Sequence, residues 1–403
     1  MSLVRRVLRS RVLRPLVEPL RAARTISRFT FRDDEAGPFG HLPRLPRREI
    51  ASRLLAWRRR HGDLRGDALF YGIDRDGGVA PESVVAYDLF KAIRDRSNRT
   101  LTGPNDYNYA CLVQDKFVYG QYARSLGHPV PVNLALLSPG GVELLGPRRP
   151  PAPLASLWSG EVEWDGFCKP VAGGQGQGIF SLTVSGGEVC VSGEPVTPDE
   201  LAARLRGRSV VQERIVQHPD VAAFHPSSIN TLRIITVVTD DGPRPLTGVF
   251  RVGGGGSVVD NYAQGGMIVE IDLDRGVVVG EGYAKEGRAP AARHPDTGVP
   301  FDGFEIPHYH EAVRSACRFH EDLYGSHSLG WDIAFSPDGP VLIEANDRWD
   351  GYLAILDPTA IPRYLAMLGV EDPRTDRPSP HRHRWARALG SAPKPTASPK
   401  QPA

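Results

Sequence analysis

The stretch GWDIAFSPDGPVLIEANDRWDG, residues 330–351, contains two apolar runs separated by a Pro-Asp-Gly turn. This pattern predicts a β-hairpin. Glu344 and Asn346 lie two residues apart in the second strand, so their side chains share one face, and the turn brings Asp332 of the first strand near them. Two carboxylates and an amide are hard oxygen ligands of the kind that Mg²⁺ takes beside nucleotide phosphates. The alternative interpretation is a polar outer face on an edge hairpin.

The composition is that of an ordinary globular protein. The chain has 403 residues, of which 24% are charged and 40% are hydrophobic, enough for two or three domains with a sizeable core. A net charge of +2 gives no global attraction to nucleic acid, so we expect no nucleic-acid partner. The four cysteines form no C-x-x-C pair, which argues against a zinc ribbon or a disulfide framework and favours a reducing, cytoplasmic setting.

The two ends differ from the rest in composition. Residues 1–32 contain nine arginines and one acidic residue. We interpret residues 1–35 as a basic leader that is either poorly ordered or lies peripherally on the inner, anionic membrane face. Its Arg-rich, acid-poor composition also resembles that of a transit peptide. Pro15 and Pro19 are expected to interrupt any helix there. Residues 371–403 are rich in Pro, Ser and basic residues and are predicted to be disordered.

Between these ends the periodicity changes along the chain. Residues 48–62 and 84–97 show helical spacing. Asp115 is expected to be the N-cap of a further helix, and Gly127 its C′ residue. From residue 131 onward, short apolar runs separated by turn residues predict strands, most of them in antiparallel hairpins. The fold class is therefore α+β, mainly antiparallel in its second half.

A glycine-rich segment, GGQGQG at residues 173–178, lies between two predicted strands. It is not a Walker A loop, because no Gly-Lys-Ser/Thr follows, and it is not a Rossmann fingerprint, because a strand follows rather than a helix. Its backbone N–H groups could contact phosphate oxygens, and Lys169 on the incoming strand could supply a compact charge. The alternative is a mobile hairpin tip with an exposed lysine. The glycines of this loop are Gly173, Gly174, Gly176 and Gly178.

Arg233 lies in the segment SSINTLRII, which is predicted to be a strand. It is an isolated cation on a face that is otherwise apolar. An arginine in such a place is usually paired with an acid or a phosphate. Two interpretations stay open: a contact with a phosphate, or a structural ion pair with one of the acids of the 330–351 hairpin.

Four features occur in a fixed order: Lys116 at the start of a helix, Lys169 before the glycine loop, VVQERI, and the Asp…Glu-x-Asn hairpin. This order and spacing resemble the ATP-grasp superfamily. The segments VVQERIVQHPDVAAFHPSSINTLRIITV, DNYAQGGMIVEID and GWDIAFSPDGPVLIEAN look more narrowly like the sugar-transfer-associated ATP-grasp domain. The resemblance covers residues 100–365.

The resemblance implies a fold in which two α+β subdomains clasp ATP and a smaller N-terminal domain precedes them. It assigns the N-terminal domain to residues 36–130, the small subdomain with the glycine loop to 131–215, and the large subdomain with the metal site to 216–370.

The resemblance also implies which residues bind ATP. They are Lys116 and Lys169 and the four loop glycines (phosphates), Glu213, Arg214 and Ile215 (adenine) and Asp220 (ribose). At the ribose position many relatives carry Glu rather than Asp. Asp332, Glu344 and Asn346 match the metal triad that would hold Mg²⁺, for which Mn²⁺ can substitute.

Further residues are implied to lie beside the reacting groups. Lys169 and Arg233 are implied to be catalytic, since they match groups that stabilise a transferring phosphoryl group. The residues that the resemblance places at the border of this phosphate and the acceptor are Asn230, Asn261, Gly265 and Gly266. The alternative for the segment that contains the last three is a pair of Gly-rich turns.

The activity implied is that of an ATP- and Mg²⁺-dependent ligase. A small-molecule carboxylate would become an acyl-phosphate, and a nucleophile, most often an amine, would then displace phosphate. The resemblance suggests a setting in the biosynthesis of cell-surface polysaccharides or peptide-like metabolites. Two alternatives are a kinase-like phosphotransferase acting on a sugar or glycan, and a non-catalytic nucleotide-binding module. The complete metal triad argues against the module.

Overall fold

A computed structural model describes residues 14–31, 38–61, 67–79, 84–100, 109–145, 150–174, 176–255, 265–284, 289–323 and 325–371. The predictions for residues 1–13, for Asn261 and for the tail from residue 372 lie outside this part of the chain. Within it, no helix is both long and apolar enough to cross a membrane.

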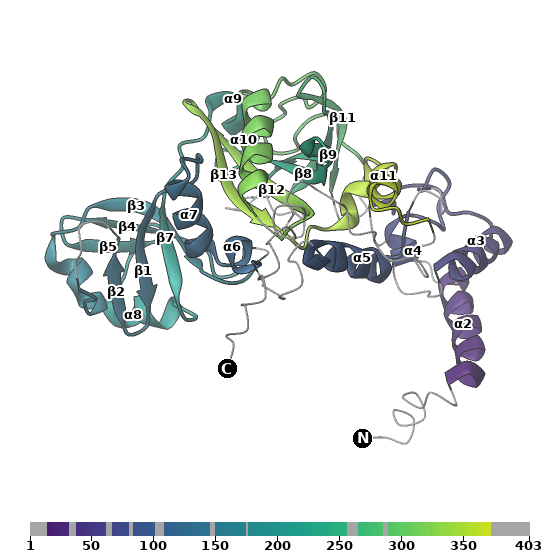
Figure 1. Cartoon of the computed structure of the whole chain (residues 1–403), viewed down its shortest axis with the longest axis horizontal. Coiled ribbons are helices and arrows are strands. Elements are labelled where there is room, and N and C mark those ends of the chain that lie inside the picture. The colour runs from purple at the N-terminus through teal and green to yellow at the C-terminus, as the bar shows by residue number, and fades with distance from the viewer. Residues whose placement is uncertain are drawn as a thin grey trace, which may run out of the picture.

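Two antiparallel sheets contain the strands (Figure 1). The seven-stranded sheet has the spatial order β2 (Gly141–Leu144), β1 (Asn133–Ser138), β7 (Ser209–Glu213), β3 (Trp164–Pro170), β4 (Phe180–Ser185), β5 (Glu188–Val191) and β6 (Glu194–Pro195). The six-stranded sheet has the order β11 (Val277–Ala284), β10 (Met267–Asp272), β9 (Gly242–Val252), β8 (Thr231–Thr239), β12 (Ser328–Ser336) and β13 (Gly339–Asn346). The predicted α+β class and its hairpins are confirmed.

Helices surround the two sheets. They are α2 (Arg14–Phe31), α3 (Arg47–His61), α4 (Asp67–Phe70), α5 (Tyr87–Thr100), α6 (Cys111–Gln114), α7 (Lys116–Ser125), α8 (Pro198–Arg204), α9 (Pro219–Ala222), α10 (Tyr309–Asp322) and α11 (Ala360–Met367), with the 3-10 helices η2 (Leu154–Ser159) and η4 (Gly351–Ile355). Asp115 caps α7 as predicted, because its side chain accepts hydrogen bonds from two backbone N–H groups of the first turn. Gly127 follows with a φ of 80°.

The seven-stranded sheet buries one face beneath η2 and α8. Leu157 of η2 and Leu201 of α8 are fully buried with strand residues such as Leu182. Cys168 of β3 belongs to the same core, so the next residue, Lys169, points to the opposite face of the sheet. This alternation leaves Lys169 on the face that carries no α8.

The six-stranded sheet is covered by helices on both faces. On one face, Leu329, Trp331 and Ile333 alternate along β12 and share a core with Ala316 and Phe319 of α10. Trp331 is fully buried there. The intervening residues of β12, among them Asp332, therefore point to the other face.

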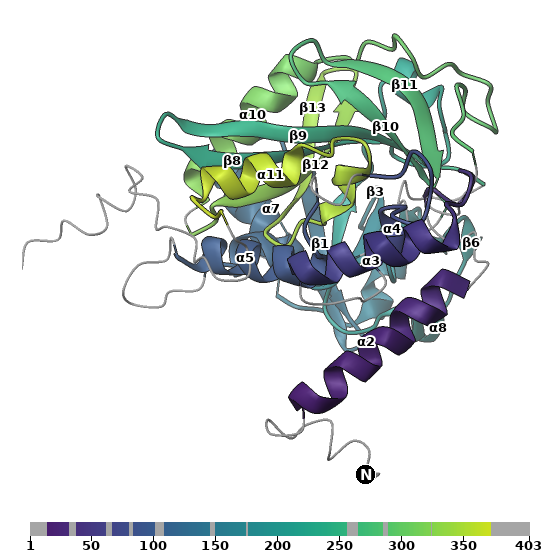
Figure 2. The ribbon, with the colours of Figure 1, turned by 90° about the vertical axis from the view of Figure 1, so that its right-hand side faces the viewer.

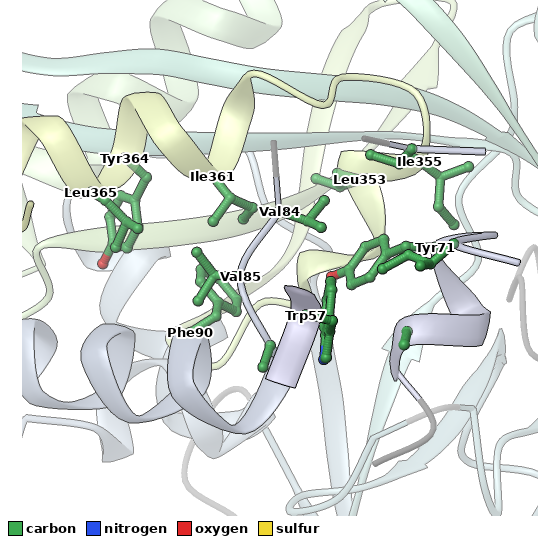
Figure 3. Packing of buried hydrophobic residues seen from close by; sticks show 14 of the residues in the cluster. Trp57, Tyr71, Val84, Val85, Phe90, Leu353, Ile355, Ile361, Tyr364 and Leu365 are labelled. Carbon is green, nitrogen blue, oxygen red and sulfur yellow. The ribbon is translucent and has the colours of Figure 1, made fainter. Parts of the chain in front are cut away.

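The other face is partly covered by helices from both ends of the chain. Ile235 and Val237 of β8 share a core with helices α3, α5 and α11, which run across the sheet in Figure 2. Figure 3 shows Trp57 of α3, Phe90 of α5 and Tyr364 of α11 in this core. The N-terminal helices therefore form one layer with α11 near the end of the described chain.

Helix α2 extends from this layer at the end of the molecule opposite the seven-stranded sheet (Figure 1). It runs unbroken through Pro15 and Pro19, so the expectation that these prolines interrupt the helix is wrong. Pro15 lies in the first turn, where the missing N–H has no partner in any helix. At the other end, the Arg44 guanidinium donates a 2.7 Å hydrogen bond to the carbonyl of Phe29 and holds the C-terminus of α2.

Asn98 of α5 joins the N-terminal helices to the backbone around the β12–β13 hairpin. Its buried side-chain oxygen accepts hydrogen bonds of 2.9 Å from the N–H groups of His327 and Ser328. Its amide nitrogen donates to the carbonyls of Ser328, at 3.2 Å, and Asp347, at 2.7 Å. One side chain thus fixes the start of β12 to the segment that follows β13.

The Asn98→Ala variant should lower stability by about 2–4 kcal/mol, because it leaves several buried backbone groups without a partner. Urea unfolding followed by fluorescence of the buried tryptophans measures the change. Lys91→Ala, on the exposed side of the same helix, is the control and should keep the wild-type midpoint. Equal midpoints for the two variants would contradict the role of Asn98.

Candidate active site

A charged row crosses three neighbouring strands of the six-stranded sheet. Arg233 of β8 is the register partner of Asp332 of β12, and Asp332 is the partner of Glu344 of β13. The Arg233 guanidinium donates two hydrogen bonds to the Asp332 carboxylate, at 2.5 and 2.8 Å. The ion pair with an acid of the 330–351 hairpin, which the sequence left open as an alternative, is therefore present. A contact of Arg233 with a phosphate stays a prediction.

A second arginine binds the same carboxylate. Arg251 of β9 donates a 2.8 Å hydrogen bond to Asp332 Oδ1, and its side chain is largely buried. Burial by itself would raise the pKa of Asp332, but the two arginines more than offset this effect and the pKa lies below its usual range. Burial likewise opposes the charge of Arg233, but Asp332 together with Tyr352 and Glu344 outweighs it, so the pKa of Arg233 is raised. Asp332 and Arg233 are therefore both charged at neutral pH.

Gly330 makes room for this row. A Cβ placed on Gly330 would lie 2.7 Å from Cβ of Trp349 and 3.1 Å from Cδ1 of Ile235. The same Cβ would lie 3.5 Å from Nη1 of Arg233. The absence of a side chain at this position lets the charged row and the helical core share one face of the sheet.

The predicted metal ligands of β13 meet a lysine from α7. Lys116 Nζ lies 3.5 Å from Glu344 Oε2 and donates a 2.9 Å hydrogen bond to the carbonyl of Gly173 in the glycine loop. Asn346 donates a 3.2 Å hydrogen bond to Glu344 Oε1. Lys116 therefore links the glycine loop of one sheet to the carboxylates of the other.

Lys169 lies on the face of the seven-stranded sheet that is turned toward these groups. Its ammonium donates a 3.0 Å hydrogen bond to Gln212 of β7, which in turn donates to Asn133 of β1 at 3.0 Å. Burial lowers the pKa of Lys169 to about 8. The negative charge of Glu344 opposes this decrease in the pKa, and the positive charge of Lys116 adds to it. The lysine is mostly charged at pH 7 and loses its charge in mildly alkaline solution.

The glycine loop has the backbone that glycine favours. Gly173, Gly176 and Gly178 have φ values of 127°, 70° and 73°. A Cβ on Gly173 or Gly174 would meet no atom within 4 Å. Glycine is favoured at position 173 because of its backbone conformation and not because of crowding. At Gly173 and Gly174 the backbone is open to a ligand.

The predicted adenine and ribose residues lie along the connection between the sheets. Glu213 ends β7 with an exposed side chain, and the N–H of Arg214 bonds the carbonyl of Asp165. The Arg214 side chain pairs with Asp165 at 2.6 Å and stacks over Phe167. Exposed Asp220 lies 3.8 Å from Nδ1 of His218. The adenine and ribose roles stay predictions.

The predicted acceptor border contains a fully buried side chain. Asn230 donates hydrogen bonds to the carbonyls of Val221 and His225 and accepts one from the N–H of Gly253. These bonds tie α9 to the end of β9, so Asn230 shapes this border from within. Gly265 is exposed and Gly266 is buried, and their contact with an acceptor stays a prediction.

The donor set suits a hard divalent cation. Carboxylate and amide oxygens are the ligands that Mg²⁺ prefers, and Glu344 and Asn346 offer one of each on a single strand face. Asp332 is nearby, with both of its oxygens accepting from arginine. Among the described residues, no group of three His, Cys, Asp or Glu side chains is spaced as a metal site. The predicted triad differs from such a group because its third member is an asparagine.

Three functional candidates were missed in the sequence. Arg251 was missed although it is a single cation in the apolar run LTGVFRV, the same signal that singled out Arg233. Gln212 was missed because it precedes Glu213 in VVQERI, and the interpretation of that motif considered only the acidic residue. Tyr119 is buried, donates to the carbonyl of Leu342 and has a pKa raised by burial and by Glu344; no local pattern marks it.

Several solved structures resemble the chain at low sequence identity. The solved structures that resemble the chain include a RimK domain protein ATP-grasp from Sphaerobacter thermophilus (12% identity, 64% of this chain and 69% of that chain, TM-score 0.35). An N5-carboxyaminoimidazole synthase from Aspergillus clavatus has 14% identity, 65% and 53% coverage and a TM-score of 0.37. An L-amino acid ligase from Bacillus licheniformis has 13% identity, 65% and 46% coverage and a TM-score of 0.35.

The match spans about half the length of the last two proteins, and no curated protein sequence matches the chain. The family match is the informative one. A sequence model described as sugar-transfer associated ATP-grasp covers residues 96–360, which include both lysines, the glycine loop and the whole charged row. The predicted resemblance and fold are confirmed: the chain belongs to the sugar-transfer associated ATP-grasp family.

Proposed function

We propose that this protein is an ATP- and Mg²⁺-dependent ligase that joins a carboxylate to an amine or a similar nucleophile and releases ADP and phosphate. One observation carries the proposal: in the described part of the chain, one cationic side chain from α7 and three from the two sheets gather around two carboxylates. The cations are Lys116, Lys169, Arg233 and Arg251, and the carboxylates are Asp332 and Glu344.

This excess of positive charge suits a polyphosphate. A triphosphate brings several negative charges, and a cluster of fixed cations in a partly desolvated site stabilises them more than water-exposed cations would. The open glycine loop beside Lys116 adds backbone N–H groups for the same oxygens. Glu344 and Asn346, with Asp332 beside them, would hold Mg²⁺, which when bound neutralises phosphate charge and polarises a phosphoryl oxygen.

The residues of the chain would then position the reacting groups. A carboxylate oxygen of the substrate attacks the γ-phosphorus of ATP, the bond to the β–γ bridging oxygen breaks, and ADP leaves. Lys169 and Arg233 stabilise the negative charge on the phosphoryl oxygens during transfer, and Asp332 keeps Arg233 in place. The nucleophile next attacks the acyl carbon, the C–O bond to phosphate breaks, and the nucleophile loses its proton.

The chemistry of the family suggests where the substrates belong. The family is described as sugar-transfer associated, and we place the carboxylate and the nucleophile among the building blocks of cell-surface polysaccharides or peptide-like metabolites. Solved relatives include an L-amino acid ligase and a D-alanyl-alanine synthetase, which supports amide formation as the reaction. A cytoplasmic location, where ATP is available, is part of the proposal.

A product assay tests the reaction class. The protein is incubated with ATP, Mg²⁺ and pools of amino acids, sugar acids and amines, and hydroxylamine is added to trap an acyl-phosphate as a hydroxamate. The ligase should yield ADP, free phosphate and an amide or hydroxamate in equal amounts. ADP with a phosphorylated sugar and no free phosphate would instead identify a phosphotransferase, and ATP binding without any turnover would identify a binding module.

Loss of a β13 oxygen ligand should abolish turnover. Glu344→Ala and Asn346→Ala should each lower the rate of ATP consumption by at least about 100-fold, because charge stabilisation of the transferring group is lost. Glu188→Ala, an exposed glutamate on strand β5, is the matched control and should keep full activity. Wild-type rates in either β13 variant at saturating Mg²⁺ would refute the site.

The pKa of Lys169 predicts how ATP binding depends on pH. Because the lowered pKa is about 8, Lys169 is charged below that pH and neutral above it. ATP affinity should therefore be highest below pH 8 and should fall above it by up to about tenfold per pH unit, the limit for one linked proton. Calorimetric titration from pH 7.5 to 9.5 measures this. Lys169→Arg, which stays charged throughout, should flatten the profile, and an unchanged slope would exclude Lys169 as the titrating group.

A further inference from the structure

A shallow apolar groove runs between α2 and α3, far from the charged row. Ala23, Ser27 and Phe31 follow one another at four-residue intervals along α2, and Ala51 and Leu55 do the same along α3, so each set forms a stripe. The groove has a volume of about 480 Å³. Phe31 is 61% exposed and Leu55 is 43% exposed, so two large apolar side chains face outward at this place.

Arginines border this groove on both helices. Helix α2 contains four arginines and one glutamate, and α3 contains six arginines and one glutamate, so the two helices have a formal charge of +8, ignoring His61. Exposed Arg24 and Arg28 lie one residue beyond Ala23 and Ser27 on α2. The Arg47 guanidinium lies 5.0 Å from the ring centroid of Phe31. The surface is therefore apolar in the middle and strongly basic around it.

This combination matches one kind of partner better than others. A nucleic-acid backbone would satisfy the arginines and leave Phe31 and Leu55 without apolar contacts. A second copy of this surface would bring two charges of +8 together. The interface of an anionic membrane offers phosphate groups for the arginines and acyl chains for the apolar stripe at the same depth.

We propose that the α2–α3 groove docks the protein onto the surface of a membrane that contains anionic phospholipid. Phe31 and Leu55 enter the boundary between headgroups and acyl chains, while the arginines contact the headgroups. The two helices lie on the surface, and no helix of the described chain is suited to cross it. The groove lies at the opposite end of the molecule from the seven-stranded sheet (Figure 1), so docking keeps that sheet away from the membrane surface.

The proposal extends and relocates the peripheral contact predicted for residues 1–32. Helix α3 is part of the surface, although it lies outside that range, and Leu55 and the arginines of α3 supply half of the groove. The exposed faces of two packed helices, held together by a buried seam that includes Ile26 and Leu54, present the contact. A folded pair of helices would thus both attach the protein to the membrane surface and fix its orientation on that surface.

Vesicle co-sedimentation of the full chain tests the proposal. The protein should sediment with vesicles of phosphatidylcholine and phosphatidylserine at low salt and be released as salt rises, and it should ignore vesicles of phosphatidylcholine alone. Arg24→Gln with Arg28→Gln should weaken partitioning by about fivefold per arginine. The double variant Phe31→Ser/Leu55→Ser should also weaken partitioning. Because the lost contribution is apolar, the difference in partitioning between this variant and wild type should depend less on salt than the difference between the arginine variant and wild type.

Matched controls separate the groove from general surface effects. Leu126→Ser changes a leucine of nearly equal exposure, 42%, at the end of α7, and Arg244→Gln removes an exposed arginine from β9. Both should bind vesicles like wild type. Residues 1–13 are intact in every variant, so equal binding by all variants would assign the contact to those residues and overturn the proposal.

Other occupants of the groove would give different results. Absence of sedimentation with anionic vesicles at low salt would overturn the proposal directly. If sedimentation velocity shows that wild type is a dimer and that the double variant Phe31→Ser/Leu55→Ser is a monomer, a second copy of the chain occupies the groove. Tighter binding to duplex DNA than to anionic vesicles at the same salt, lost in the arginine variant alone, would make nucleic acid the partner. Circular dichroism confirms that each variant remains folded.

Discussion

The buried ion pair that Asp332 forms with Arg233 and Arg251 is the constraint on which the rest of the site depends. Taking charged groups out of water is costly, and their mutual attraction offsets that cost only with close, well-oriented contacts. Here the contacts require three neighbouring strands, β8, β9 and β12, to hold one register. Loss of one partner would leave an uncompensated charge in the sheet, at a cost of about 3–5 kcal/mol. The charged row and the register of the sheet therefore stabilise each other.

The same face of the six-stranded sheet serves two purposes. Toward one side it is apolar and packs under the N-terminal helices, and toward the other it carries the charged row. Gly330 lies at the boundary, where Trp349 of the apolar side and Arg233 of the charged side approach the same backbone. Because Asn98 of α5 fixes the backbone on both sides of this boundary, the N-terminal helices become part of the frame that positions Glu344 and Asn346.

Local patterns in the sequence were sufficient for the hairpin, for the α7 cap and for the glycine loop, because each depends on neighbours within a few residues. They did not show that Asp332 would be held by two arginines, since Arg251 reaches it across two strand pairings that no local spacing records. The course of α2 was mispredicted for a related reason: propensity argued for a break at Pro19, and packing of Ile26 and Phe29 against α3 overrode it. Residues that act across the chain need the tertiary structure to be recognised.

The strand order of the seven-stranded sheet has a consequence for how such a protein can be rebuilt. Its first and last strands along the family segment, β1 and β7, are direct neighbours, with Asn133 paired to Gln212. The polypeptide thus enters and leaves this unit at one place, so the unit is an insertion between α7 and α9. The unit is continuous in sequence and has its own core. A unit of this kind can be exchanged for that of another family member by joining two adjacent chain ends, which gives a direct route to chimaeric proteins.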